Sequence, residues 1–273
     1  MYVLIAALLF SMLPQRGTPP NPLNDPNAPR AIAARNTIWI EDMTWLEVGD
    51  AIKAGKTTAM ILTGGIEQNG PYLTTGKHNV ILKAMGESIG RKLGNSLIAP
   101  IVTLEPGNPA TSRSPGTILL SEATYNAVLT DMSFSLKAQG FKNIVIIGDS
   151  GGNQRGMKAV ADTLTTEWKS DPSARVHYIT EYYDHYDEKV WDPMMVRFGV
   201  KEVLEGLHDD YGTTAVMMMV DPESVRLKER VAAKRTTING ISIVPETKTL
   251  EIAKKIVEDR ANATVAAIRK AVQ

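Results

Sequence analysis

The sequence contains no cysteine. This absence excludes disulfide bonds, thiolate nucleophiles and zinc sites built from cysteine ligands. A net charge is also lacking, because 30 Lys and Arg residues balance 30 Asp and Glu residues across the 273-residue chain. Binding to nucleic acid or to an anionic membrane surface depends on a positive field, so we expect neither partner. Any catalysis must use carboxylates, imidazoles, hydroxyls, amides or amines.

Long apolar runs are scarce. One of them, Met1–Leu13, is too short for a comfortable membrane span and has the length of the hydrophobic part of a signal peptide. Residues 14–29 are rich in Pro and Asn, as in an extended linker. We therefore expect a signal-like segment and linker over residues 1–30 and a single domain over residues 31–273. The mature protein would be exported, periplasmic or secreted, without a stable membrane span; a buried N-terminal strand and a cytoplasmic location are the alternatives.

Strand and helix patterns alternate along the rest of the chain. Short apolar runs bounded by polar residues predict strands, and apolar residues repeating at three and four positions predict helices. This alternation favours an α/β fold, a three-layer α/β/α arrangement with a largely parallel central sheet. The predicted strands are residues 57–63, 96–102, 117–120, 143–147 and 174–180, and the predicted helices are residues 44–54, 79–93, 121–140, 154–168 and 248–271.

Polar residues collect in three segments next to predicted strands or apolar stretches. Residues 64–79 follow the first strand, residues 148–154 follow the most apolar strand, and residues 208–210 precede the apolar stretch 215–220. Ligands of parallel sheets bind where loops leave the carboxyl ends of the strands. We therefore expect the chemistry in these segments, with their polar side chains close together over one edge of the sheet.

A serine follows the most apolar strand in a G-x-S-x-G pattern. Gly148, Ser150 and Gly152 form this pattern between a predicted strand and a predicted helix, where a nucleophile elbow would lie. The chain order Ser150, Asp184, His208 is compatible with a catalytic triad. The alternative is a serine that caps the following helix.

Glu67, His78 and Asp149 are residues of the types that bind Zn or Mn in proteins. Glu67 and His78 lie on the same predicted loop, and Asp149 follows the most apolar strand. The alternative interpretation is that these side chains are solvated or structural.

Four motifs in order resemble the creatininase (creatinine amidohydrolase) family. Residues 67–74 read EQNGPYLT where the family has E-Q-H-G-P-H-L-P, and the motif ends at His78 in place of Asp. Residues 115–117 give P-G-T. Residues 148–153 read GDSGGN where the family has N-G-H-G-G-N, and residues 208–215 read HDDYGTTA where it has H-A-G-x-x-E-T-S.

The resemblance implies a divalent metal centre that this sequence has altered. The family holds two metals with the Glu, His and Asp of the first motif and the His of the third. Of these, Glu67 is kept, whereas Asn69, His78 and Ser150 stand in place of His, Asp and His. We therefore expect one Zn or Mn ion rather than two, held by Glu67, His78 and Asp149.

The resemblance also implies hydrolysis of a cyclic amide or related C–N bond in a small polar substrate, by homo-oligomers. His208 matches the family's proton-transfer residue, and we expect Asp209 or Asp210 to orient it. An inactive family member that binds a small polyol, sugar or lactam and a serine hydrolase that uses Ser150 are the alternatives. The predicted site is catalytic His208 and Asp210; substrate-binding Asn69, Ser150, Asn153 and Asp209; and metal-binding Glu67, His78 and Asp149.

Overall fold

The computed structural model describes residues 25–273, which belong to two compact units divided after Ala34. In the first unit, a turn is closed by a hydrogen bond from the Ala28 N–H to the Asp25 carbonyl (3.0 Å). The predicted export segment, Met1–Leu13, lies outside the described residues. The second unit, Arg35–Gln273, contains every predicted site residue. No helix in the described part of the chain is long and apolar enough to cross a membrane.

The second unit is built on a sheet of four parallel strands in the order β2–β1–β3–β4. The two central strands pair along their whole length, from Thr58 opposite Asn143 to Thr63 opposite Gly148. Every residue of β1 is buried, which is why its sequence is a continuous apolar run. The strands are β1 (Thr58–Thr63), β2 (Ser96–Ile98), β3 (Asn143–Gly148) and β4 (Arg175–Tyr178).

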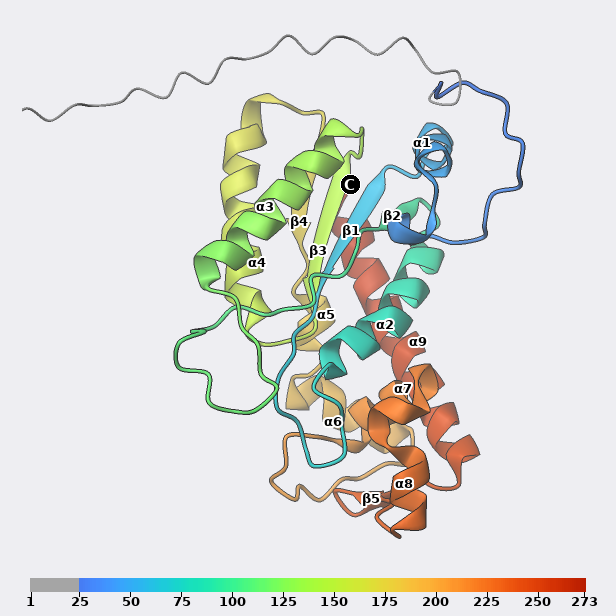
Figure 1. The fold of residues 1–273 in the computed structure, drawn as a ribbon, viewed down its shortest axis with the longest axis vertical. Coiled ribbons are helices and arrows are strands. Elements are labelled where there is room, and N and C mark those ends of the chain that lie inside the picture. Colours follow the sequence, from blue (N-terminus) through green and yellow to red (C-terminus); the bar gives the residue numbers. More distant parts are fainter. Residues whose placement is uncertain (1–24) are drawn as a thin grey trace, which may run out of the picture. The chain divides into compact units, whose positions relative to one another are not determined.

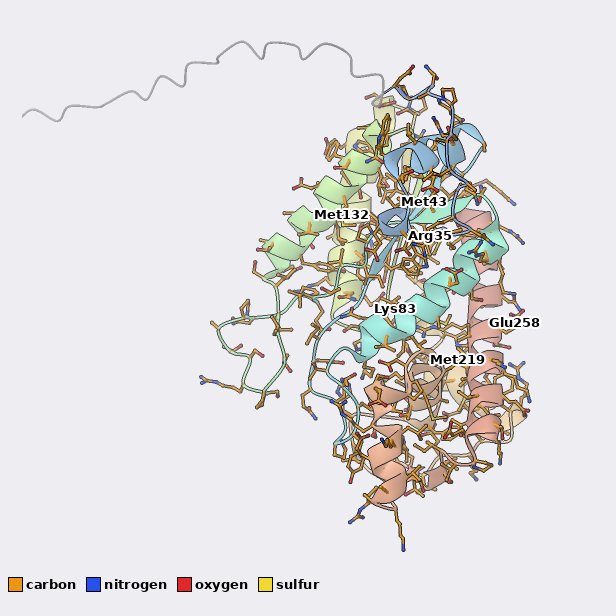
Figure 2. The ribbon with its side chains drawn as sticks, turned by 45° about the vertical axis from the view of Figure 1, so that its right-hand side comes forward. Arg35, Met43, Lys83, Met132, Met219 and Glu258 are labelled. Carbon is orange, nitrogen blue, oxygen red and sulfur yellow. The ribbon has the colours of Figure 1, made fainter. Side chains whose placement is uncertain are left out.

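Helices cover both faces of this sheet, which confirms the predicted α/β/α arrangement (Figure 1). Helices α3 and α4 pack on one face, and α2 packs on the other with α9 beside it. A surface ion pair between Lys92 and Glu258 (2.6 Å) joins α2 to α9, with Glu258 on the outer side of α9 (Figure 2). These helices are α2 (Lys77–Leu93), α3 (Glu122–Ala138), α4 (Asn153–Glu167) and α9 (Glu246–Ala271).

Two predicted strands differ from the structure. The predicted strand 96–102 ends at Ile98, because Pro100 has no N–H to donate to a neighbouring strand. Residues 117–120 join no sheet; Ile118 and Leu120 form isolated bridges with Ile66 and Pro106. The prediction of a strand there was wrong, because its apolar residues pair with loops.

Several shorter elements were not predicted from the sequence. Helix α7 contains the Met-rich stretch, and its first eight residues are buried.

The predicted helix at residues 44–54 is α1, which begins with a capping box formed by Thr44 and Glu47. The remaining elements are α1 (Trp45–Lys53), α5 (Glu181–Asp184), α6 (Glu188–Arg197), α7 (Tyr211–Val220), α8 (Leu227–Ala232), the hairpin β5 (Thr237–Ile238) and β6 (Ile241–Ser242), and the 3₁₀ turns Ile40–Asp42, Trp168–Ser170 and Pro222–Val225.

Two helical glycines provide a matched test of the packing of α2 on the sheet. A Cβ atom added at Gly86 would lie 2.5 Å from Leu62 Cδ1 on β1, whereas one added at Gly49 on α1 meets nothing within 4 Å. We expect Gly86→Ala to destabilise the fold by about 1–2 kcal/mol through overpacking, after the gain in helix propensity. Gly49→Ala should stabilise it by roughly 0.5–1 kcal/mol.

Urea unfolding of the two variants measures both effects. Stabilisation by both substitutions would contradict the close packing of α2 against β1.

Candidate functional site

A chain of hydrogen bonds joins three elements at the carboxyl edge of the sheet. His78 Nε2 lies 2.6 Å from Glu67 Oε1, and His78 Nδ1 lies 2.8 Å from Asp149 Oδ2. Glu67 comes from the loop after β1, His78 from the first turn of α2, and Asp149 from the residue after β3. The imidazole therefore bridges two carboxylates, and the three side chains predicted to share a site do meet.

Asp149 is fully buried and surrounded by hydrogen-bond donors. Its Oδ1 accepts from the hydroxyls of Tyr182 (2.7 Å) and Tyr186 (3.2 Å) and lies 3.1 Å from Arg260 Nη1. Its Oδ2 is the atom that faces His78. A buried carboxylate is stable only when it is paired and hydrogen-bonded, and these contacts meet that requirement.

His208 and Lys77 also lie beside Glu67 Oε1, the oxygen that faces His78. Lys77 Nζ lies 3.4 Å from Glu67 Oε1 and 3.4 Å from His208 Nε2. The His208 Nδ1 is 2.8 Å from the Gln68 carbonyl oxygen, which can only accept. In neutral His208 the proton is therefore on Nδ1, and the lone pair on Nε2 accepts a hydrogen bond from the Lys77 ammonium. A second bond, from the Gly70 N–H to the His208 carbonyl (3.1 Å), ties the two loops together.

The charges of this cluster follow from burial and pairing. Burial alone would lower the pKa of His78, but its hydrogen bonds to Asp149 and Glu67 outweigh that effect and raise the pKa to about 9. Burial alone would raise the pKa of Glu67, but the hydrogen bond from His78 and the charge of Lys77 lower it to about 2. Burial would likewise raise the pKa of Asp149, but the charge of Arg260 and the His78 hydrogen bond lower it to about 2. At neutral pH, His78 is an imidazolium between two carboxylates.

Among the other predicted residues, Asp210 and Asp209 do not contact the His208 ring in any described hydrogen bond. Asp210 is the N-cap of α7, where its carboxylate accepts from the Thr213 N–H and hydroxyl, each at 2.6 Å. Asp209 lies close to Gly70, and its Oδ1 is buried without a hydrogen-bond partner. The orienting contact of His208 is the Gln68 carbonyl instead.

The two asparagines expected to bind substrate brace the backbone. Asn153 Nδ2 donates to the carbonyls of Thr63 (2.9 Å) and Gly64 (2.8 Å), which ties α4 to the end of β1. Asn69 Nδ2 donates to the carbonyls of Glu67 (3.1 Å) and Thr74 (3.0 Å), which closes the loop that carries Glu67. Both asparagines shape the site through the main chain.

Ser150 donates a hydrogen bond to Glu105, which sequence reasoning did not connect with the site. Burial raises the pKa of Glu105, although the Ser150 hydrogen bond acts in the opposite direction. Asp184 and His208, the partners proposed for a serine triad, make no described contact with Ser150. Within residues 25–273, positive φ outside glycine occurs at Arg226, Lys234 and Asn239 and not at Ser150, so the strained backbone of a nucleophile elbow is absent there.

Sequence reasoning also missed the residues that hold Asp149. Arg260 lies on the buried stripe of α9, between Ile256, Val257 and Thr264, where apolar spacing continues on both sides. An arginine at an apolar position of an amphipathic helix is a signal that a buried acid partner exists, although the partner's identity cannot be read from it.

A cavity of about 220 Å³ opens on the cluster. At about 30 Å³ for each water molecule it holds about seven waters, which is the space of a small ring compound. Lys77, His78 and Asp149 lie at this cavity together with His208, so the buried charges are accessible to a small molecule. The rest of the wall is formed by Tyr183, Tyr186, Leu207, Asp209, Asp210 and Thr213.

The donors at the cluster do not fit a divalent metal in this arrangement. A ligating imidazole must be neutral with a free lone pair, but both nitrogens of His78 are bound to carboxylates. The Lys77 ammonium lies within 3.4 Å of Glu67 Oε1 and of His208 Nε2, so both of these atoms already face a cation. Accordingly, no group of three or more His, Asp or Glu residues in the described part of the chain is arranged to hold a metal ion.

Comparisons with known proteins agree with the family resemblance. The family model for creatininase, described as creatinine amidohydrolase, matches residues 41–270. A solved structure described as creatininase with Mn has a TM-score of 0.66 at 19% identity, covering 86% of this chain and 99% of that one. A Zn-Zn type mutant creatininase gives 0.65 at 18% identity, covering 87% and 99%. A mutant creatininase complexed with creatine gives 0.65 at 19% identity, covering 86% and 99%. No curated protein matches the chain.

The charged state of His78 predicts how stability depends on pH. Folding raises the pKa of His78 from 6.5 to about 9, so its stabilising contribution is complete below pH 6.5 and is lost as the pH rises to about 9. We expect the free energy of unfolding to fall by on the order of 2–3 kcal/mol across this window. His78→Gln should flatten the profile.

His185→Gln is the matched control for this experiment. His185 is also buried and lies near Asp259, but burial and the charge of Arg260 lower its pKa, so its contribution to stability changes with pH in the direction opposite to that of His78. Denaturant unfolding between pH 6 and 9.5 measures the three profiles. A wild-type profile that is flat, or that His185→Gln flattens equally, would contradict the assignment.

Proposed function

The chain belongs to the creatininase family, and we propose that it is a hydrolase that opens an amide or related C–N bond in a small, polar, cyclic substrate. The family match and the shared fold support the reaction class. The single observation that carries the proposal is the meeting of an unprotonated imidazole nitrogen, His208 Nε2, with the Lys77 ammonium at the wall of the cavity.

His208 suits the role of general base and acid. Its Nδ1–H is bound to the Gln68 carbonyl, so Nε2 is the nitrogen that can accept a proton. When Lys77 turns from Nε2 to the carbonyl oxygen of the substrate, a water molecule takes its place at Nε2 and loses a proton to that nitrogen while the water oxygen attacks the carbonyl carbon. The protonated imidazole then donates the proton to the departing nitrogen as the C–N bond breaks. The net reaction adds one water.

Lys77 suits the role of stabilising the charge that develops on the carbonyl oxygen. It is held beside the cavity by Glu67, and it is itself largely buried, so its charge acts in a partly water-free environment. His78 fixes the same Glu67 oxygen through its 2.6 Å hydrogen bond. The proposed route uses no divalent metal, because the side-chain atoms of the cluster that could ligate one are already bound to cationic side chains of the protein.

Substitution of His208 tests the proposal. We expect His208→Gln to lower kcat by about 10²–10⁴-fold, because the base and acid are the same group. His177→Gln is the control, since His177 lies on β4 and contacts Asn143 away from the cavity. The assay presents five- and six-membered cyclic amides, imides and ureas and follows ring opening by the mass gain of one water. Equal rates for wild type and His208→Gln would reject the proposal.

The two alternative functions give different outcomes in the same assay. Ser150→Ala should keep at least about a tenth of wild-type kcat if Ser150 supports Glu105 and the loop. If Ser150 is the nucleophile, the same substitution should abolish turnover. Saturable binding of a ring compound, sugar or polyol without any turnover by wild type would identify a non-catalytic binder.

Metal dependence is tested separately. The family resemblance led us to expect one Zn or Mn ion. The potential ligand atoms are instead bound to other side chains, so we expect the purified protein to contain less than about a tenth of an equivalent of either metal. Activity should survive treatment with a chelator. Elemental analysis and the chelated rate are the measurements. Activity that disappears on chelation and returns with Zn or Mn would show that the cluster rearranges around a metal.

A further inference from the structure

Arg260 is a buried arginine that reaches the site from α9, the last helix of the chain. Only 2% of its surface is exposed. Its Nη1 lies 3.1 Å from Asp149 Oδ1, and its Nε donates to the Tyr182 carbonyl at 2.9 Å. The guanidinium lies 3.7 Å from the centre of the Tyr182 ring and 4.0 Å from that of Tyr186. This side chain is therefore fixed by contacts on three sides.

The contacts of Arg260 determine how Asp149 is oriented. Arg260 and the Tyr182 hydroxyl both bind Oδ1, which leaves Oδ2 directed at His78 Nδ1. A carboxylate that rotated would take its oxygen away from the imidazole. Because the guanidinium is planar and fixed at two atoms, it prevents this rotation in a way that a flexible ammonium cannot.

The orientation of His78 affects the positions of Lys77 and His208 through a continuous series of contacts. His78 Nε2 holds Glu67 at 2.6 Å, Glu67 holds Lys77 at 3.4 Å, and Lys77 faces His208. His78, Glu67 and Lys77 are charged and mostly buried, so a misplaced member leaves an unpaired charge beside the next. The position of the Lys77 ammonium therefore depends on the carboxylate that Arg260 fixes.

We propose that Arg260 is a positioning residue, which fixes Asp149 and thereby sets the ring orientation of His78 and the placement of Lys77 at the cavity. This inference rests on the proposed hydrolase function for its effect on rate. Its effect on His78 is independent of any activity. Arg260 is not itself part of the cavity wall and makes no described contact with Lys77 or His208, so its action on the reaction passes through Asp149 and is indirect.

Two substitutions test the inference. Arg260→Lys keeps the charge but cannot span Asp149 and the Tyr182 carbonyl together, and Arg260→Gln removes the charge. Loss of a partner that orients a metal-ligating side chain typically costs about 10–100-fold, and we take this range for the partner of Asp149. We expect kcat to fall within that range for Arg260→Gln and by less for Arg260→Lys. KM should change by less than about twofold, because no contact with substrate is lost.

Arg230→Lys is the matched control. Arg230 is equally buried, donates to the carbonyls of Arg235 and Thr237, and lies over the Tyr72 ring at 4.9 Å. Its substitution should lower stability without a selective loss of kcat. Rates are corrected for the folded fraction measured by unfolding of each variant.

The ring N–H resonance of His78 is observed in protein labelled with ¹⁵N-histidine. Its chemical shift should not change if Arg260 only stabilises the fold. It should shift in both Arg260 variants and stay in place in Arg230→Lys. An unshifted His78 resonance in folded Arg260→Lys would overturn the inference, and so would losses of kcat that match those of Arg230→Lys. Should His208→Gln retain full activity, the hydrolase proposal fails while the His78 resonance still decides the role of Arg260.

Discussion

The hydrogen bonds from one buried imidazole to two carboxylates hold the site together. His78 connects Glu67, on a loop after one central strand, to Asp149, at the end of the other. None of these groups could be buried alone as a charge, because the cost of removing an isolated charge from water is large. Together with Arg260 and Lys77 they form a set of paired charges. The parallel pairing of β1 with β3 brings the three segments within reach of one another.

The same arrangement explains how a creatininase-family fold can carry a site with altered residues. The chain has the family's fold, but the positions that the motif resemblance aligns with the family's metal ligands carry Asn69, His78 and Ser150. Asn69 closes its own loop, and Ser150 binds Glu105. We propose that protein cations, above all Lys77, supply the positive charge that the reaction needs. The cavity beside them has a volume of about 220 Å³.

Much of the fold could be predicted from the sequence because it depends on local pattern. The apolar run of β3 and the capping box of α1 are both encoded within a few neighbouring residues. The strand predicted at residues 117–120 was wrong, because pairing partners are not visible in a single segment. Of the site, the meeting of Glu67, His78 and His208 was expected. Glu105 and Arg260 could not be assigned, because their partners lie 45 and 111 positions away in the chain.

The central claim is that His78 is doubly protonated in the folded protein and donates to both carboxylates. Its most direct test is the ¹⁵N spectrum of the ring nitrogens at pH 7.5, in protein labelled with ¹⁵N-histidine. The account predicts that both nitrogens of His78 carry a proton at this pH, because the pKa of the ring is about 9. A spectrum in which either His78 nitrogen is bare or bound to a metal would contradict it.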